Sequence, residues 1–157
     1  MKQYIGTKII HAEPAFRVSG LDKKNIVYPK PCPVPLGKEN EDWEDGYKVI
    51  YPDGYESWSP RDVFEAVYRE TNGMNFGLAI EAAKMGKKIA RAGWNGKGQY
   101  VELAYCISYK NHDAEVINAN HCNIGNKAFA FVGTSGVQMG WLASQADMLA
   151  DDWYIVE

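Results

Sequence analysis

The sequence predicts an α+β fold in which a small antiparallel sheet with one main helix and one short helix follows a smaller module of strand, hairpin and helix. Turn residues at 52–54 and 133–136 each separate two segments of strand-like composition, which predicts two hairpins. Residues 75–86 place apolar side chains at the three-and-four spacing of a helix. We expect the chain to divide into residues 1–73 and residues 74–157.

Length and composition are those of an ordinary globular protein. The chain has 157 residues, of which 46% are hydrophobic and 24% charged, enough for one domain or two very small ones. It has no apolar run of membrane-spanning length and no signal-peptide core, so we expect a cytoplasmic protein without a membrane partner. The formal net charge of −3 argues against a general binder of nucleic acid polymers, which needs many cationic contacts with phosphates. Three widely spaced cysteines indicate reduced thiols.

The first module is predicted to contain three strands. Residues 2–12 alternate as a half-buried strand does, whereas residues 21–43 contain four prolines and end in an acidic run, which predicts a long loop. Residues 46–51 and 55–58 flank a Pro-Asp-Gly turn and are expected to pair as a hairpin.

A helix is predicted to follow this hairpin. Ser59 is a suitable N-cap, and Pro60 suits the first helical position because it lacks the N–H that a helix start leaves unpaired. The apolar face of this helix is expected to consist of Val63, Phe64, Val67 and Tyr68. Nothing in the module indicates an activity, and we interpret its aromatic residues as packing.

The main helix of the second module is predicted from Asn75, a suitable N-cap, to Gly86, a typical residue just past a helix end. Its apolar face is formed by Phe76, Ala79, Ile80 and Ala83. Residues 87–91 then predict a short strand, and residues 93–98 predict a loop because three glycines surround Trp94.

The rest of the second module is predicted to be mainly strands. Residues 99–109 predict one strand, and the polar residues 111–126 predict an irregular excursion. Residues 128–132 and 137–141 are expected to form a hairpin. The final elements are a short helix over residues 145–150, capped by Ser144, and a strand over residues 153–156, in which Trp153 is a core residue.

A basic stretch surrounds the loop at residues 93–98. Its cations are Lys84, Lys87, Lys88, Arg91 and Lys97, with no acid between Glu81 and Glu102. A basic loop with an aromatic ring and exposed amides fits an anionic, ring-containing ligand such as a nucleotide: Trp94 would stack on the base while Arg91 binds phosphate oxygens. The alternative is a solvated strand face beside a core tryptophan. A Walker-type phosphate loop is excluded because Gly98 follows Lys97 where Ser or Thr is required.

A resemblance to a known family lies in two segments, MNFGLAIEAAKMGKKIARAGWNGKGQYVEL from Met74 and WLASQADMLADDWYIV from Trp141. Both resemble the second Thoeris anti-defence family, small phage proteins that sequester cyclic ADP-ribose-type signalling nucleotides made by TIR-domain enzymes. The resemblance covers residues 74–157, and the two motifs occur in the family's order. Shorter members begin at the position of Met74. Residues 1–73 therefore look like an added region, similar to leading segments of uncharacterised phage proteins.

The resemblance implies a protein that binds a cyclic ADP-ribose isomer without catalysis, in the cytoplasm of an infected bacterium. Some members also hold cyclic dinucleotides, so a guanine-containing cyclic dinucleotide is a second expected ligand. Family members are homo-oligomers, typically tetramers, with ligand pockets at subunit contacts. We expect no cofactor.

The family's motifs imply a ligand site on two segments. Trp94 is expected to stack on a base, with Arg91 and Asn95 near phosphate or ribose. The second motif is expected to supply an aromatic wall and polar contacts through Trp141, Ser144 and Gln145. Asn75 and Phe76 match the opening motif, although capping and core packing explain both equally well.

Two rival functions remain open from the sequence. The first is a nucleotide hydrolase, in which Asp147, Asp151 and Asp152 would hold magnesium or Ser144 would pair with His121. A helix start and a turn explain these acids without a metal. No nucleophile-elbow motif surrounds Ser144. The second is a phage structural or assembly protein with no small-molecule ligand. No metal site is expected at His112, His121 and Cys122, because paired ligand spacing is absent.

Overall fold

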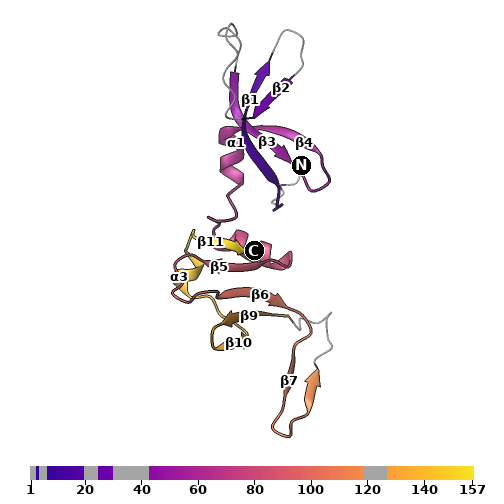
Figure 1. The fold of residues 1–157 in the computed structure, drawn as a ribbon, viewed down its shortest axis with the longest axis vertical. Coiled ribbons are helices and arrows are strands. Elements are labelled where there is room, and N and C mark those ends of the chain that lie inside the picture. The colour runs from indigo at the N-terminus through magenta and orange to yellow at the C-terminus, as the bar shows by residue number, and fades with distance from the viewer. Residues whose placement is uncertain (1–2, 4–6, 20–24, 30–42, 119–126) are drawn as a thin grey trace. The chain divides into compact units, whose positions relative to one another are not determined.

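The computed structural model describes residues 3, 7–19, 25–29, 43–118 and 127–157. The chain forms two compact units, Met1–Arg69 and Glu70–Glu157 (Figure 1). Both units combine antiparallel strands with short helices, which confirms the predicted α+β fold class. None of the helices among these described residues is long and apolar enough to cross a membrane.

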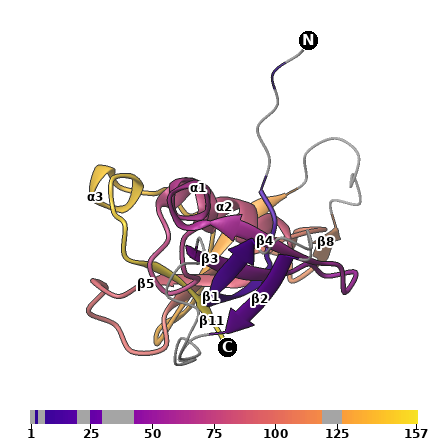
Figure 2. The ribbon, with the colours of Figure 1, turned by 90° about the horizontal axis from the view of Figure 1, so that it is seen from above.

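The first unit is a four-stranded antiparallel sheet of order β2-β1-β3-β4 with one helix. Its elements are β1 (His11–Ser19), β2 (Asn25–Pro29), β3 (Trp43–Ile50), β4 (Glu56–Pro60) and α1 (Arg61–Val67). Strands β1 and β2 lie side by side in Figure 2. The helix packs on β3 through stacked rings of Tyr47 and Phe64, whose centroids lie 4.1 Å apart.

Two predictions for the strands and loops of the first unit are wrong. The strand expected over residues 2–12 instead begins at His11, because residues 11–18 pair with β3 along its whole length. The loop expected over residues 21–43 contains β2, an edge strand that ends at Pro29, where a missing backbone N–H is tolerated. The remainder of that predicted loop, residues 30–42, lies outside the described residues.

The predicted hairpin of β3 and β4 is confirmed, but the helix after it differs in detail. Pro60 occupies the N-cap position without a side-chain cap, so Ser59 does not cap the helix as predicted. Phe64 stacks on Tyr68 and both are half-buried, whereas Val63 and Val67 are 58% and 59% exposed. Phe64 of the seven-residue helix and Tyr68 just after it are therefore partly buried, whereas the two valines of the helix face outward.

The second unit is built on a five-stranded antiparallel sheet of order β10-β9-β6-β5-β11. Its strands are β5 (Lys88–Arg91), β6 (Tyr100–Ala104), β9 (Ala128–Gly133), β10 (Gly136–Met139) and β11 (Trp153–Val156). Helix α2 (Phe76–Lys84) packs on β5, β6 and β11. The buried core between them consists of Met74, Ala79, Ala82, Ala83, Ile89, Val101 and Trp153.

The local signals of the main helix are confirmed. Asn75 Oδ1 accepts a hydrogen bond of 3.0 Å from Leu78 N, and Gly86 follows the helix with φ of +82°. Only small residues, Ala79, Ala82 and Ala83, are buried on the helix, so its backbone approaches the sheet closely. These small side chains leave room in the core for the large ring of Trp153.

The single strand predicted over residues 99–109 is wrong. Strand β6 ends at Ala104, and Cys106 adopts φ of +56°, a left-handed conformation that interrupts a strand. The chain then forms a separate hairpin of β7 (Ser108–Lys110) and β8 (Val116–Asn118). Residues 111–118 of the predicted excursion are thus a turn and a strand, and residues 119–126 lie outside the described part.

The end of the chain follows the prediction. Strands β9 and β10 pair through Gly133 and Gly136, and Ser144 caps α3 (Gln145–Met148), which ends two residues earlier than expected. Strand β11 then pairs with β5. Trp153 is fully buried, as predicted for a core residue.

We predict that a chain beginning at Glu70 folds without residues 1–69, because every member of the core cluster lies in the second unit. The measurement is urea unfolding of this shortened chain, followed by tryptophan fluorescence. A single cooperative transition is expected. A gradual change without a transition would contradict the prediction.

Candidate functional site

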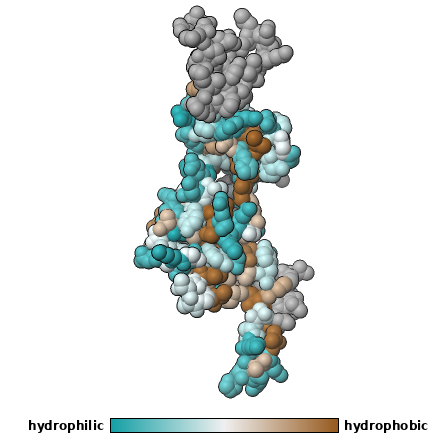
Figure 3. Space-filling view, in the orientation of Figure 1, coloured by the Kyte–Doolittle hydropathy of each residue, from teal (hydrophilic) through white to brown (hydrophobic). Residues whose placement is uncertain are grey.

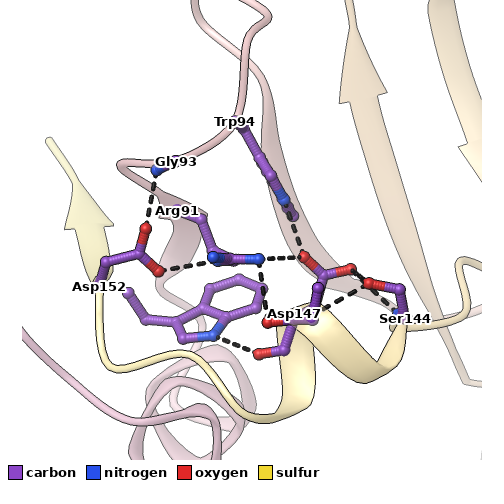
Figure 4. A network of polar contacts seen from close by, with 8 residues as sticks. Arg91, Gly93, Trp94, Ser144, Asp147 and Asp152 are labelled. Carbon is purple, nitrogen blue, oxygen red and sulfur yellow. Dashed lines mark hydrogen bonds and ion pairs between the residues drawn. The ribbon is translucent and has the colours of Figure 1, made fainter.

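The candidate site lies where strand β5 ends and strand β11 begins. These strands pair with Arg91 opposite Trp153, so Asp152 lies beside the arginine at the end of the sheet. The short helix α3 brings Asp147 to the same place. Side chains from three separate segments therefore meet in one network (Figure 4).

Arg91 lies between the two carboxylates of this network. Its Nε donates to Asp152 Oδ1 at 2.8 Å, and its Nη1 donates to Asp147 Oδ1 at 2.8 Å. Nη1 also donates to the backbone oxygen of Ala146 at 3.1 Å. The side chains of Arg91 and Asp147 are only 16% and 12% exposed, so their ion pair is largely shielded from water.

Asp147 is the one buried charged residue among the residues that the structure describes. Its Oδ1 accepts from Trp94 Nε1 at 3.0 Å as well as from Arg91, and its Oδ2 accepts from the backbone N and the hydroxyl of Ser144 at 3.0 and 2.7 Å. Its backbone oxygen accepts from Trp153 Nε1 at 2.9 Å. Asp147 thus joins α3 to the core and to the loop after β5.

Burial raises the pKa of Asp147, but hydrogen bonds from Arg91, Ser144 and Trp94 outweigh burial and hold the pKa well below its ordinary value. The hydrogen bond from Arg91 likewise lowers the pKa of Asp152, against the opposing effect of burial. The hydrogen bonds of Arg91 with Asp152, which has the larger effect, and with Asp147 raise the pKa of Arg91. All three groups are therefore charged near neutral pH.

Three tryptophan rings pack edge to face beside this network, and two of them, Trp94 and Trp153, donate hydrogen bonds to Asp147. Trp94 lies 5.4 Å from Trp153 and 6.0 Å from Trp141 between ring centroids, with interplanar angles of 76° and 71°. Trp94 also meets Phe131 at 5.5 Å. Trp153 is buried, while Trp94 and Trp141 are partly exposed at the edge of the core.

The structure brings most of the expected site residues into this region. Trp94, Trp141, Arg91 and Ser144 belong to the network or to the tryptophan cluster. The exposed residues Asn95 and Gln145 follow Trp94 and Ser144 directly in the sequence.

Three of these residues also have structural roles. Ser144 forms a capping box with Asp147, and Asn75 caps α2. Phe76 packs on Trp153 at 5.5 Å. Capping and packing thus account for Asn75 and Phe76 without a ligand.

The cations of the basic stretch do not gather at one place in the structure. Lys84 pairs with Glu81 on α2, and the Lys88 ammonium lies 4.6 Å from the ring centroid of Tyr100. Lys88 and Arg91 are three residues apart on one strand, so they project from opposite faces of the sheet. Lys97 is an exposed cation on the loop that carries Trp94.

Sequence reasoning missed Asp147 and Asp152 as partners of Arg91. From the sequence, both aspartates were considered as magnesium ligands. Their pairing with Arg91 was missed because the order of the strands was not known. The signal that identifies them is the pairing of the last strand with β5, which aligns the Asp151-Asp152 turn with the end of the arginine strand. Among the described residues, no group of three His, Cys, Asp or Glu could hold a metal ion, and His121 and Cys122 lie outside them.

We predict that acid destabilises the protein through these carboxylates. Both have a lower pKa in the folded state than the value of about 3.9 typical of an unfolded chain, so the stability they provide is present above about pH 4 and is lost as the pH falls through the folded pKa. The measurement is the free energy of unfolding in urea between about pH 7 and about pH 2.

The matched variant is Asp147→Asn, which cannot titrate at this position. It should be less stable at neutral pH by about 2 kcal/mol, because it loses a charge-assisted hydrogen bond, and its stability should decline less steeply in acid. Equal acid sensitivity of wild type and variant would contradict the prediction.

Comparison with known proteins identifies the family of the second unit. A model described as the Thoeris anti-defense 2-like domain matches residues 74–156, more than half of the chain. A protein of Bacillus phage SP01 called Thoeris anti-defense 2 is 36% identical over 87 residues, covering 53% of this chain and 94% of the phage protein. The family model falls on the second unit, and the resemblance expected from the two sequence motifs is confirmed. The chain belongs to the Thoeris anti-defense 2-like family.

Proposed function

We propose that this chain is a phage anti-defence protein that binds a cyclic ADP-ribose isomer made by a TIR-domain immune enzyme and holds it unchanged. The signal is then kept from its effector in the cytoplasm of the infected host. Family membership over the second unit supports the anti-defence role. The geometry of Trp94 supports nucleotide binding as its mechanism.

The observation that carries this proposal is a pair of partly exposed indoles held in a fixed arrangement. Trp94 and Trp141 lie 6.0 Å apart at 71°, so their planes form a corner. Contacts with Phe131 and Asp147 fix the first ring. A ring that is already ordered loses little entropy when a ligand stacks on it, and such stacking contributes about 1–3 kcal/mol per base.

Polar residues that could bind a phosphate or a ribose are close in sequence to these two tryptophans. The loop after Trp94 exposes Asn95 and Lys97, and Gly98 has φ of +67°, which favours turns whose amides point to one side. Gln145 is exposed at the start of α3, directly after Ser144. We propose that these groups bind the sugar and phosphates, and that a guanine-containing cyclic dinucleotide is a second ligand.

A homo-oligomer, with the tetramer of the family as its expected form, would complete the pocket. A unit of this size has little interior in which to enclose a dinucleotide. Leu142 and Leu149 are 89% and 79% exposed, and they flank the segment that carries Ser144 and Asp147. Apolar residues also reach the surface of the second unit on the face drawn in Figure 3. We propose that a second subunit covers this surface and closes the pocket.

Holding the ligand fits this site better than cleaving it. The Ser144 hydroxyl donates to Asp147 and accepts from its backbone N–H, as a helix cap does. The Asp147 carboxylate is bound to Arg91 and Trp94, and its lowered pKa makes it a weak base. Neither group is poised as a nucleophile or a general base.

We predict that the purified chain binds a cyclic ADP-ribose isomer and that Trp94→Leu weakens binding at least about tenfold, through the loss of a stacking contact. The measurement is a calorimetric titration with the nucleotide, with the oligomeric state followed on a sizing column. Leucine keeps apolar contact with Phe131, so the variant is expected to fold. Tyr109→Leu, on the exposed β7–β8 hairpin, is the matched control and should bind like wild type.

The fate of the ligand separates the proposal from its rivals. Heating the complex should release the nucleotide intact, as detected by chromatography. A cleaved product would identify a hydrolase. Absence of binding together with co-purification with virion components would identify an assembly protein.

A further inference from the structure

The orientation of the Trp94 ring is not set by regular backbone structure. The residue lies in the loop between β5 and β6, and its backbone N–H makes a single long hydrogen bond of 3.3 Å to the oxygen of Arg91. The ring must therefore be oriented by its side-chain contacts. Among these, the hydrogen bond from Nε1 to Asp147 Oδ1 is the directional one.

We infer that Asp147, Arg91 and Asp152 are positioning residues for Trp94, and that Lys97 rather than Arg91 supplies the cation that meets the ligand's phosphates. This inference rests on the proposed function and assigns roles within the same site. The first part concerns the free protein and is tested without a ligand. The second part concerns how the ligand's charge is recognised.

Arg91 is poorly placed to bind a phosphate because two carboxylates already neutralise it. Nε and Nη1 are engaged with Asp152 and Asp147, each at 2.8 Å. One cation and two anions leave the cluster with a net negative charge. A phosphate that approached the guanidinium would meet these two carboxylates, which repel it.

The same cluster also fixes the start of the loop. Gly93 N donates to Asp152 Oδ2 at 2.8 Å, and a Cβ added to Gly93 would lie 2.9 Å from that oxygen. Glycine thus allows the backbone to approach the carboxylate closely. Asp152 holds the loop backbone and Asp147 holds the ring, while Arg91 bridges the two acids, so the three side chains act as one support (Figure 4).

Lys97 is the cation available on the loop itself. It lies three residues after Trp94 and is exposed, whereas the Arg91 side chain is only 16% exposed. A flexible ammonium group in water suits a point contact with a phosphate. Its contribution to binding should be sensitive to salt, because exposed charges are screened.

The first experiment measures the order of the Trp94 indole in the full-length free protein by the heteronuclear NOE of its Nε1–H group. The variants are Asp147→Ala and Asp152→Ala, which remove the acceptor oxygens, and Lys97→Gln. We expect the NOE of Trp94 to fall in both aspartate variants, to remain unchanged in Lys97→Gln, and to be constant for Trp58 of the first unit in all of them. A Trp94 ring that stays ordered in both folded aspartate variants would overturn the positioning role.

The second experiment measures the affinity for a cyclic ADP-ribose isomer at several salt concentrations. Lys97→Gln should weaken binding and flatten its salt dependence. Arg91→Lys, which keeps the charge but loses the planar fork, should weaken binding about tenfold with the salt dependence of wild type. A salt dependence in Lys97→Gln equal to that of wild type would overturn the assignment of Lys97.

These experiments separate the two levels of the proposal. If the wild-type protein binds no such nucleotide, the proposed function and the assignment of Lys97 both fail, while the ring-order measurement still decides the positioning role. If the protein binds and the Trp94 ring is ordered without the aspartates, the positioning role alone fails. If the Asp147 variant does not fold, the Asp152 variant serves in its place. The Asp152 side chain is 34% exposed, so its substitution should disturb the core less.

Discussion

The second unit depends on one buried carboxylate. The Asp147 side chain is 12% exposed, and a charge at such a depth destabilises a fold unless it is paired and hydrogen-bonded. Its four side-chain hydrogen bonds come from Arg91, Trp94 and Ser144, which stand on a strand, a loop and a helix cap. Each partner is thereby held in one place. The need to satisfy a single charge fixes how three segments meet.

This constraint connects stability with the proposed function. The tryptophans at the edge of the core contribute apolar packing, but packing alone leaves freedom for a loop residue. The hydrogen bond from Trp94 Nε1 to Asp147 removes much of that freedom, and the ring remains partly exposed. A rigid, partly exposed indole is a suitable surface for a base, so the residues that stabilise the unit also prepare it for a ligand.

Several local features of this fold are predictable from the sequence, whereas the long-range contacts are not. The Asn75 cap, the turns of two hairpins and the Ser144 cap depend on residues a few positions apart, and all form as expected. The contact between Arg91 and Asp147 joins residues 56 positions apart and follows from the strand order. The break at Cys106 was not predictable either, because a left-handed cysteine has no sequence signal. The position of Trp94 was foreseen only in part: it lies on a loop, as expected, yet it also packs against the core.

The most direct test of the account is a nucleotide titration followed at the indole Nε1–H resonances of the five tryptophans. Adding a cyclic ADP-ribose isomer should shift the resonances of Trp94 and Trp141 in proportion to occupancy, with little change at Trp58. Resonances of Trp94 and Trp141 that stay in place while the nucleotide binds would contradict it, because the ligand would then lie elsewhere on the protein.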